Sequence, residues 1–448
     1  MNTNENTVKT WIVLTCDGSG MPIAQHLKEE GKSVYVGHVQ DKSELRNDDP
    51  PEEKEDQEKR LKQFEGIVRK ESAKKLVKAL KTIKDKDSYF IFCDRNNLWY
   101  YAEQLQKAGF KNGIFPSKED FNLEKEREEA MNFVEQNYPD VQIIPHQKVK
   151  TVEEAKKLVE ESDVPLVVQS EGDFVFTVVG PDDLEQNKKV ILATLDSHAA
   201  DYAKGEIIIK KKLVKPVEIT PQMVFWDGKP VYTSIDIETK NIGDGENNGP
   251  QVGCGTNLII RTDMDDPINE IAFPPKVYEL AKKHPGLFIW DISLYFTEDG
   301  IFFGEFCSNR FGYDSLQTEM CMSHGPSEYF EKIKQGENPI EHFKYGTSVR
   351  VFNVKVKEDQ EIQVENYKPV WIYDAYMKDG KILTVGEDWD LAVITGRGNS
   401  VVEAVENVYN NLRFFTFKEG YMRTKDDFLA DYPTSIMRRF NDTKDIYY

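Results

Sequence analysis

Two carboxylates stand out because each interrupts a run of apolar residues. Asp291 lies in Leu287–Phe296 and Glu305 lies in Ile301–Phe306, with Glu298-Asp299-Gly300 between the two runs. Two apolar runs around such a turn predict a β-hairpin, and acids on one face of a hairpin come close enough to share a cation. An unpaired charge is costly in apolar surroundings, and magnesium prefers hard oxygen ligands. The pair therefore predicts a metal site; the alternative is a surface hairpin with ordinary charged residues.

Two further positions could bind an anion. Arg310, next to Asn309, follows the second strand of the hairpin and carries a planar fork that suits a phosphate or a carboxylate. Gly18 and Gly20 lie in a turn that follows a strand and precedes a helix, where free backbone N–H groups can meet a phosphate. A plain tight turn accounts equally well for these two glycines.

The elements before this hairpin indicate a parallel α/β domain. Strand Thr10–Thr15, helix Met21–Glu30 and strand Ser33–Val39 form a strand–helix–strand unit, and Ser88–Asp94 and Lys111–Phe115 add strands. The Glu- and Lys-rich stretch Arg46–Lys86 predicts a loop followed by an exposed helix. The Gly- and Asn-rich stretch Ile242–Gly255 predicts a loop.

Composition limits the class of protein. The chain has 448 residues, enough for two to four packed units, with 39% hydrophobic and 30% charged residues. A net charge of -20 argues against a nucleic-acid surface. No apolar run of membrane-spanning length and no secretory signal is expected. The five cysteines are scattered, which favours free thiols and a cytoplasmic protein.

Four segments, in order, resemble phosphoribosylamine–glycine ligases, which are ATP-grasp proteins. They are Pro116-Ser117-Lys118-Glu119 with Leu123-Glu124, the glycine-rich stretch from Gly243 to Thr256, the run Thr297–Gln317 containing Glu305-Phe306 and Arg310-Phe311-Gly312-Tyr313-Asp314, and the carboxyl-terminal set from Val393 to Arg423. The resemblance implies an α/β and α+β chain with the ATP-grasp fold. It implies an N-terminal Rossmann-like domain (1–118), an ATP-grasp domain (119–330, with a small lid part at about 140–210) and a C-terminal α+β domain (331–448).

The resemblance also implies roles for individual residues. Asp291 and Glu305 would hold magnesium (or manganese) on ATP, and Asn309 and Arg310 would lie beside the phosphates or the acceptor substrate. Further nucleotide and substrate contacts would come from Arg127, Gln169, Glu218, Glu238, Lys240, Gly253 and Gly255, and Gly18 and Gly20 would meet a phosphorylated substrate.

Some positions depart from the family pattern. Gln169 stands where the family has a nucleotide-binding lysine, and Ser170–Phe174 has a single glycine where a glycine-rich lid is expected. Lys210-Lys211-Lys212 replaces acidic residues of the adenine hinge. This lysine run either restores positive charge to the pocket or is a solvated strand end.

Two functions follow from the resemblance. The first is an ATP-dependent carboxylate–amine ligase that acts through an acylphosphate and joins glycine or a similar carboxylate to a small amine, as in purine biosynthesis. The alternative is a catalytically degenerate ATP-grasp protein that binds a ligand or a partner. A calorimetric titration with Mg-ATP discriminates between them.

Overall fold

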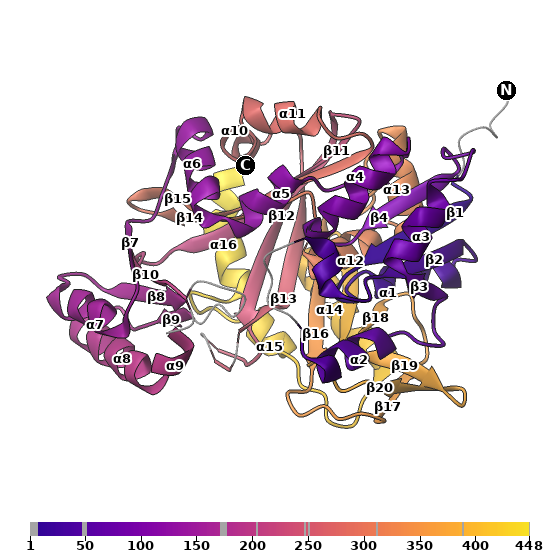
Figure 1. Cartoon of the computed structure of the whole chain (residues 1–448). Coiled ribbons are helices and arrows are strands. Elements are labelled where there is room, and N and C mark those ends of the chain that lie inside the picture. Colours follow the sequence, from indigo (N-terminus) through magenta and orange to yellow (C-terminus); the bar gives the residue numbers. More distant parts are fainter. Residues whose placement is uncertain are drawn as a thin grey trace. The chain divides into compact units, whose positions relative to one another are not determined.

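The computed structural model describes residues 8–46, 52–170, 177–202, 205–245, 248–249, 251–310, 312–387 and 389–447. Its contacts divide the chain into two compact units (Figure 1). The first unit comprises Met1–Tyr138, Glu218–Leu294 and Gly304–Tyr448, and the second comprises Pro139–Val217 and Tyr295–Phe303. The predicted borders after residues 118 and 330 lie inside the first unit, and the three-domain division stays a prediction.

The first unit begins with a parallel sheet, as its apolar strands predict. Its strands run in the order β5-β4-β1-β2-β3. The strands are β1 (Thr10–Thr15), β2 (Ser33–His38), β3 (Lys70–Ser72), β4 (Tyr89–Cys93) and β5 (Gly113–Ile114), and the helices are α1 (Met21–Glu29), α2 (Lys54–Lys62), α3 (Ala73–Leu80) and α4 (Trp99–Lys107). The strands are apolar because helices cover a parallel sheet on both faces.

The prediction of a loop and one exposed helix over Arg46–Lys86 is wrong. The structure forms α2, β3 and α3 there, and α3 buries Leu76, Val77 and Leu80. These apolar residues recur at helical spacing on one face. The many charged residues between them concealed this stripe, because they occupy the solvent-facing positions of the same helix.

The sheet of the first unit continues into a largely antiparallel region. Leu287 of β14 pairs with Ile114 of β5, and the order continues as β14-β11-β12-β13-β16-β21-β18. These strands are β11 (Val217–Trp226), β12 (Lys229–Asn241), β13 (Gln251–Thr262), β14 (Leu287–Thr297), β16 (Tyr345–Phe352), β18 (Val370–Ile372) and β21 (Asp390–Gly398). The predicted hairpin is confirmed: β14 pairs with β15 (Gly300–Ser308).

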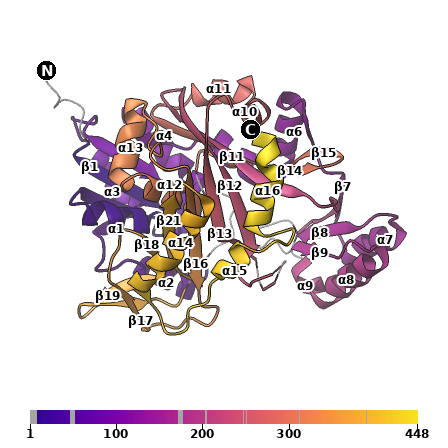
Figure 2. The same cartoon turned by 180° about the vertical axis from the view of Figure 1, so that it is seen from behind.

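Helices cover both faces of this region. A Cβ at Gly346 would meet Thr318 and Met322 of α12 (Tyr313–Met322), whereas one at Gly396 would meet α14 (Val401–Asn411). Figure 2 shows α14 and the last helix, α16 (Ile436–Tyr447), over the face seen from behind.

The remaining elements of the first unit flank this sheet. They are η1 (Lys42–Leu45), η2 (Asn96–Leu98), α5 (Lys118–Lys125), α6 (Arg127–Asn137), α10 (Pro267–Ala272), α11 (Pro275–Ala281), α13 (Pro326–Gln335), β17 (Glu361–Val364), β19 (Ala375–Lys378), β20 (Lys381–Thr384), η3 (Leu412–Phe414), β22 (Phe415–Thr416) and α15 (Lys425–Phe428).

The predicted loop Ile242–Gly255 is shorter than expected. Strand β13 begins at Gln251, so Gly253 and Gly255 belong to a strand that pairs with β12. The pairing shifts register between Thr239 and Asn241, and Gly253 has a φ of +79°. Such irregular strand starts favour glycine, which is why composition alone predicted a loop.

The second unit is an antiparallel sheet with helices on one face. Its strands run in the order β7-β10-β8-β9. The elements are β7 (His146–Val149), β8 (Leu166–Ser170), β9 (Thr177–Val179), β10 (Ile207–Lys211), α7 (Val152–Glu161), α8 (Leu184–Ser197) and α9 (Ala199–Tyr202), while β6 (Val141–Gln142) pairs with Ile301 and Phe302 of β15.

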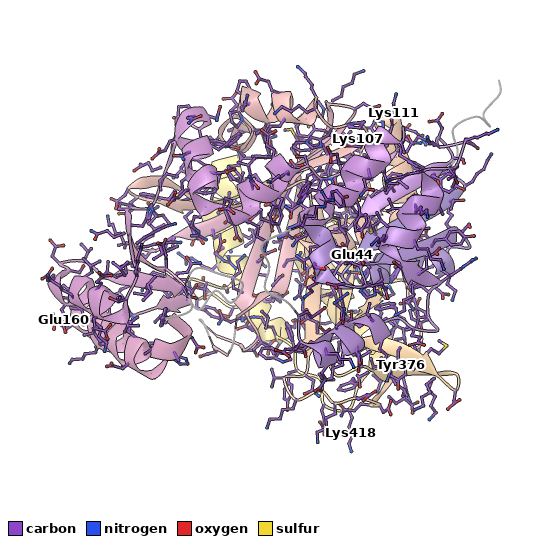
Figure 3. The ribbon with its side chains drawn as sticks, in the orientation of Figure 1. Glu44, Lys107, Lys111, Glu160, Tyr376 and Lys418 are labelled. Carbon is purple, nitrogen blue, oxygen red and sulfur yellow. The ribbon has the colours of Figure 1, made fainter. Side chains whose placement is uncertain are left out.

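Alternation along β10 separates the two faces of this sheet. Ile207 and Ile209 join the apolar core formed with α7 and α8. Successive strand residues point to opposite faces, so Ile208 and Lys210 lie on the other face. The outer side of α7 carries the exposed Glu160, labelled in Figure 3.

None of the helices in the described ranges has the length and apolar character needed to cross a membrane.

Candidate functional site

Asp291 of β14 is a buried carboxylate on the sheet of the first unit. Its side chain is 4% exposed, and its Oδ2 accepts a hydrogen bond of 3.1 Å from Gln222 Nε2. Burial raises the pKa of Asp291 well above its ordinary value, and the charges of Glu238 and Glu305 raise it further. Glu305 lies exposed on β15. The two predicted metal ligands therefore lie close enough for the charge of Glu305 to raise the pKa of Asp291.

Strand β12 contributes two more acids. Asp236 is 1% exposed, and its Oδ1 has no hydrogen-bond partner among the described residues. Burial raises the pKa of Asp236 well above its ordinary value, with further increases from Glu238 and Asp291. Asp236 was not predicted, although Asp236, Glu238 and Lys240 alternate along one strand and so share one face.

Lys240 is the cation within this group of acids. Its Nζ lies 2.9 Å from Glu238 Oε2 and 3.8 Å from Glu218 Oε1. Burial alone would lower the pKa of Lys240, but Glu238, Glu218 and Glu305 raise it well above its ordinary value. Ser293 also donates a hydrogen bond of 2.8 Å to Glu218. Four of the predicted residues thus form one charged network.

Arg439 adds a second cation that the sequence did not reveal. It lies on α16, is 6% exposed, and donates from Nη2 to the backbone oxygen of Glu238. Its Nε has no hydrogen-bond partner within the described ranges. Burial lowers the pKa of Arg439, while Glu218 and Glu238 oppose this effect. No local pattern could have indicated Arg439, because its partners lie about two hundred residues earlier.

The two residues predicted to be catalytic have protein partners. Arg310 donates from Nε to both carboxylate oxygens of Glu124, at 2.9 and 2.7 Å. Asn309 is fully buried, has a φ of +53°, and donates from Nδ2 to the backbone oxygen of Phe115 at 3.1 Å. Glu124 thereby orients Arg310, and the hydrogen bond of Asn309 fixes the chain directly after β15 to the backbone at Phe115. Their contacts with substrate stay predictions.

The predicted glycines lie in two different settings. A Cβ at Gly255 would approach Asn241 O to 2.6 Å, so glycine permits the close approach of β12 and β13. Gly18 N donates to Thr15 Oγ1 and Gly20 N donates to Asp94 Oδ2, each at 2.8 Å. Both amides of the turn after β1 are thus bonded within the protein.

The two predicted nucleotide-lysine positions lie in different units. Arg127 is the first residue of α6 in the first unit. Gln169 lies on β8 of the second unit, where its Oε1 accepts a hydrogen bond of 2.7 Å from Lys210 Nζ. A lysine ammonium therefore lies next to the neutral side chain at position 169.

The donor set fits a hard divalent cation. The charge of Glu238 raises the pKa values of Asp236 and Asp291, whereas Lys240 lowers the pKa of Glu238 against the effect of burial. One oxygen of Asp236 has no hydrogen-bond partner among the described residues. A cation among carboxylates relieves their repulsion and favours their ionised form. These residues would supply oxygen ligands only, which suits magnesium better than a soft metal.

Comparison by structure identifies similar folds. No protein-family model matches the sequence, and no curated protein matches it. A phosphoribosylamine–glycine ligase from Thermotoga maritima matches with a TM-score of 0.59 and 16% identity, covering 92% of this chain and 99% of that one.

Biotin carboxylases match over similar lengths. The biotin carboxylase domain of the Hydrogenobacter thermophilus 2-oxoglutarate carboxylase, in complex with MgADP and bicarbonate, gives a TM-score of 0.57 at 15% identity and covers 98% of this chain and 96% of that one. Biotin carboxylase from Campylobacter jejuni gives 0.56 at 13% identity, with coverages of 99% and 98%. The predicted fold is confirmed: this chain has the ATP-grasp fold, resembling phosphoribosylamine–glycine ligase and biotin carboxylase in structure.

Proposed function

We propose that this protein is an ATP-dependent carboxylate–amine ligase that acts through an acylphosphate. The observation that supports this most strongly is the buried carboxylate of Asp291, whose pKa is raised by burial and by the charges of Glu238 and Glu305. Such repulsion between buried acids is typical of a site completed by a cation. The fold adds support, because similar structures are ligases and carboxylases by name.

In the proposed reaction, a carboxylate oxygen attacks the γ-phosphorus of ATP, and the bond to the β–γ bridging oxygen breaks to release ADP. An amine then attacks the acyl carbon, and the carbon–oxygen bond to phosphate breaks. Magnesium, when bound, would be held by Asp291 and Glu305 and would neutralise triphosphate charge. The chain's own task is orientation, since phosphoryl transfer needs little covalent help.

Other residues would position these groups. Lys240 holds Glu238 at 2.9 Å and so fixes the acid beside Asp291. Glu124 fixes the guanidinium plane of Arg310, and we propose that this guanidinium lies beside a phosphate or the carboxylate substrate. We propose glycine or a similar carboxylate and a small amine as substrates, with purine biosynthesis in the cytoplasm as the setting.

Calorimetry with Mg-ATP tests the proposed site. We expect Asp291→Asn and Glu305→Gln each to weaken Mg-ATP binding by about tenfold or more, since each removes a charged ligand. Glu298→Gln is the matched control, because Glu298 is an exposed acid in the turn of the same hairpin. Equal affinity for Mg-ATP in all three variants would contradict the assignment of Asp291 and Glu305 as metal ligands.

A second function, a catalytically degenerate ATP-grasp protein that binds a ligand, is favoured by the neutral Gln169. Release of ADP with ATP, magnesium, glycine and a panel of amines separates the two functions. Mg-ATP binding without any ADP release across the panel would favour the degenerate protein.

A further inference from the structure

The turn after β1 occupies the place where an open parallel sheet binds ligands. Strand β1 lies between β4 and β2, and the chain passes to β2 and β3 on one side before it returns to β4 on the other (Figure 1). Ligands bind outside the carboxyl ends of strands at such a change of direction. Cys16–Gly20 follow β1 and Asp94 and Arg95 follow β4, so these residues lie at that edge.

The backbone of this turn is poorly suited to a phosphate. Ser19 N donates to Asp17 Oδ1 at 3.0 Å, and Gly20 N donates to Asp94 Oδ2 at 2.8 Å. Gly18 N donates to Thr15 Oγ1, and Met21 N donates to Gly18 O. A phosphate at a helix start needs free N–H donors, but the protein's own oxygen atoms already accept from these four.

Acidic groups line the turn instead. Ligand atoms of Cys16, Asp17 and Asp94 all lie within 4.8 Å of one another. Asp94 is only 3% exposed, and its Oδ1 has no hydrogen-bond partner in the described part of the chain. A buried carboxylate oxygen without a donor is costly, so this atom is suited to an N–H group from a ligand.

The charges at the turn match a monovalent cation. Arg95 Nε lies 2.9 Å from Asp17 Oδ2, and Arg95 Nη2 donates to Ser19 Oγ at 3.3 Å. A bound cation favours the ionised form of Asp94, and with Asp94 ionised the three side chains of Asp17, Asp94 and Arg95 together carry one negative charge. One ammonium group neutralises this charge, whereas a divalent metal would leave a net positive charge beside Arg95.

Two further observations agree with a cationic ligand. Asp17, Ser19 and Arg95 are partly exposed, so the turn is open to solvent. Burial, followed by the charge of Asp17, raises the pKa of Asp94 to about 8, and a cation bound beside Asp94 would favour its ionised form.

We propose that this turn binds the amino group of the acceptor substrate, with Asp94 Oδ1 accepting an N–H and Asp17 supplying a second negative charge. The assignment to the acceptor rests on the proposed ligase function. It differs from the sequence-based expectation of a phosphorylated group at Gly18 and Gly20, and it makes Asp94 a specificity-determining residue for a positively charged amine.

Ligand-observed saturation-transfer NMR on the full chain tests this site with ethanolamine as the probe. Ethylene glycol, its neutral counterpart, is the matched control probe. We expect saturation transfer to ethanolamine but not to ethylene glycol, and about tenfold weaker ethanolamine binding in Asp94→Asn. Asparagine keeps an oxygen that can accept from Gly20 N, so the turn should still form. Asp374→Asn is the control variant, because Asp374 is also buried and accepts from backbone amides.

Three results would overturn the proposal. The first is the absence of saturation transfer to ethanolamine in the unmodified protein, and the second is equal saturation transfer in Asp94→Asn and the unmodified protein. The third is binding of inorganic phosphate or Mn²⁺ that Asp94→Asn abolishes. If Asp94→Asn does not fold, Asp17→Asn serves in its place with the same expectation. This test is independent of the test of the ligase proposal. The protein could bind ethanolamine at the turn without binding Mg-ATP, and it could bind Mg-ATP without binding ethanolamine.

Discussion

At the scale of single residues, Lys210 offers a test of how the chain compensates for Gln169. Lys210 Nζ donates to Gln169 Oε1 at 2.7 Å, on the face of the small sheet opposite to that of Ile207 and Ile209. If this ammonium serves the nucleotide phosphates, Lys210→Met should weaken Mg-ATP binding by about tenfold, since a hydrogen bond to a charged group contributes about 1.5–3 kcal/mol. Isothermal titration calorimetry measures this change.

Lys211→Met is the matched control for that variant. Lys211 is the next residue on β10, so its side chain points to the opposite face, where its Nζ lies 3.8 Å from Asp299 Oδ2. We expect this variant to bind Mg-ATP as the unmodified protein does. Equal losses in both variants would indicate a general effect of net charge rather than a contact by Lys210.

The sequence predicted only part of this charged network. Asp291 and Glu305 could be predicted because an acid in an apolar strand is conspicuous and a hairpin brings its two strands together. Asp94, Asp236 and Arg439 could not, because their significance comes from burial and from partners that are distant in the chain. Such contacts have no local pattern from which they could be inferred.

At the scale of elements, Arg423 links the start of the glycine-rich loop to α15. Its guanidinium is 2% exposed, donates to Asn241 O at 2.9 Å and Gly245 O at 3.3 Å, and pairs with Asp427. Gly245 N in turn donates to Asp427 Oδ1 at 2.6 Å. Arg423→Lys keeps the charge but loses the planar fork, so we expect the Gly245 amide to exchange with solvent at least about tenfold faster.

Hydrogen exchange followed by mass spectrometry or NMR measures the exchange rate of the Gly245 amide. Arg438→Lys is the control, because Arg438 lies on α16 with its side chain 46% exposed and pairs with Asp431 and Asp442. Surface pairs contribute little, so this variant should leave exchange at Gly245 unchanged. Unaltered exchange in Arg423→Lys would show that the loop start is held by other contacts.

Elements were predicted best where hydrophobic periodicity is undisturbed. The strands at Thr10–Thr15 and the hairpin at Leu287–Phe296 are continuous apolar runs, and the structure confirms both. Periodicity did not identify α3 within its charged surroundings, nor the start of β13 among glycines. In both cases tertiary packing outweighs local composition, since burial of one face suffices to fix an element.

At the scale of the whole molecule, the predicted ATP-grasp fold came from ordered motifs rather than from any single one. Four weak resemblances in the right order restrict the possible folds of the chain more than one strong motif does. The similar structures cover nearly the whole chain at 13–16% identity. Substrate identity is not fixed at this scale, because one fold supports many chemistries and specificity depends on individual side chains.

The stability of the whole molecule should depend on pH through two buried groups with opposite effects. Burial raises the pKa of Glu319 from 4.5 to about 7, although Ser234, Tyr232 and Tyr329 donate hydrogen bonds to it. The folded state therefore binds more protons than the unfolded state between these values, and stability falls as pH rises through this window. Burial lowers the pKa of His26 from 6.5 to about 4, so its contribution is lost as pH falls from 6.5 to 4.

Glu319→Gln should expose the contribution of this carboxyl group. Glutamine stays neutral, so we expect the variant to gain stability relative to the unmodified protein as pH rises from 4.5 to 7, by up to about 3 kcal/mol. Thermal unfolding midpoints at intervals of pH measure this difference. Glu328→Gln, which removes an exposed acid from α13, should run parallel to the unmodified protein. A constant offset between Glu319→Gln and the unmodified protein at every pH would mean that Glu319 does not change its protonation on folding, and that Ser234 and the two tyrosines keep it ionised.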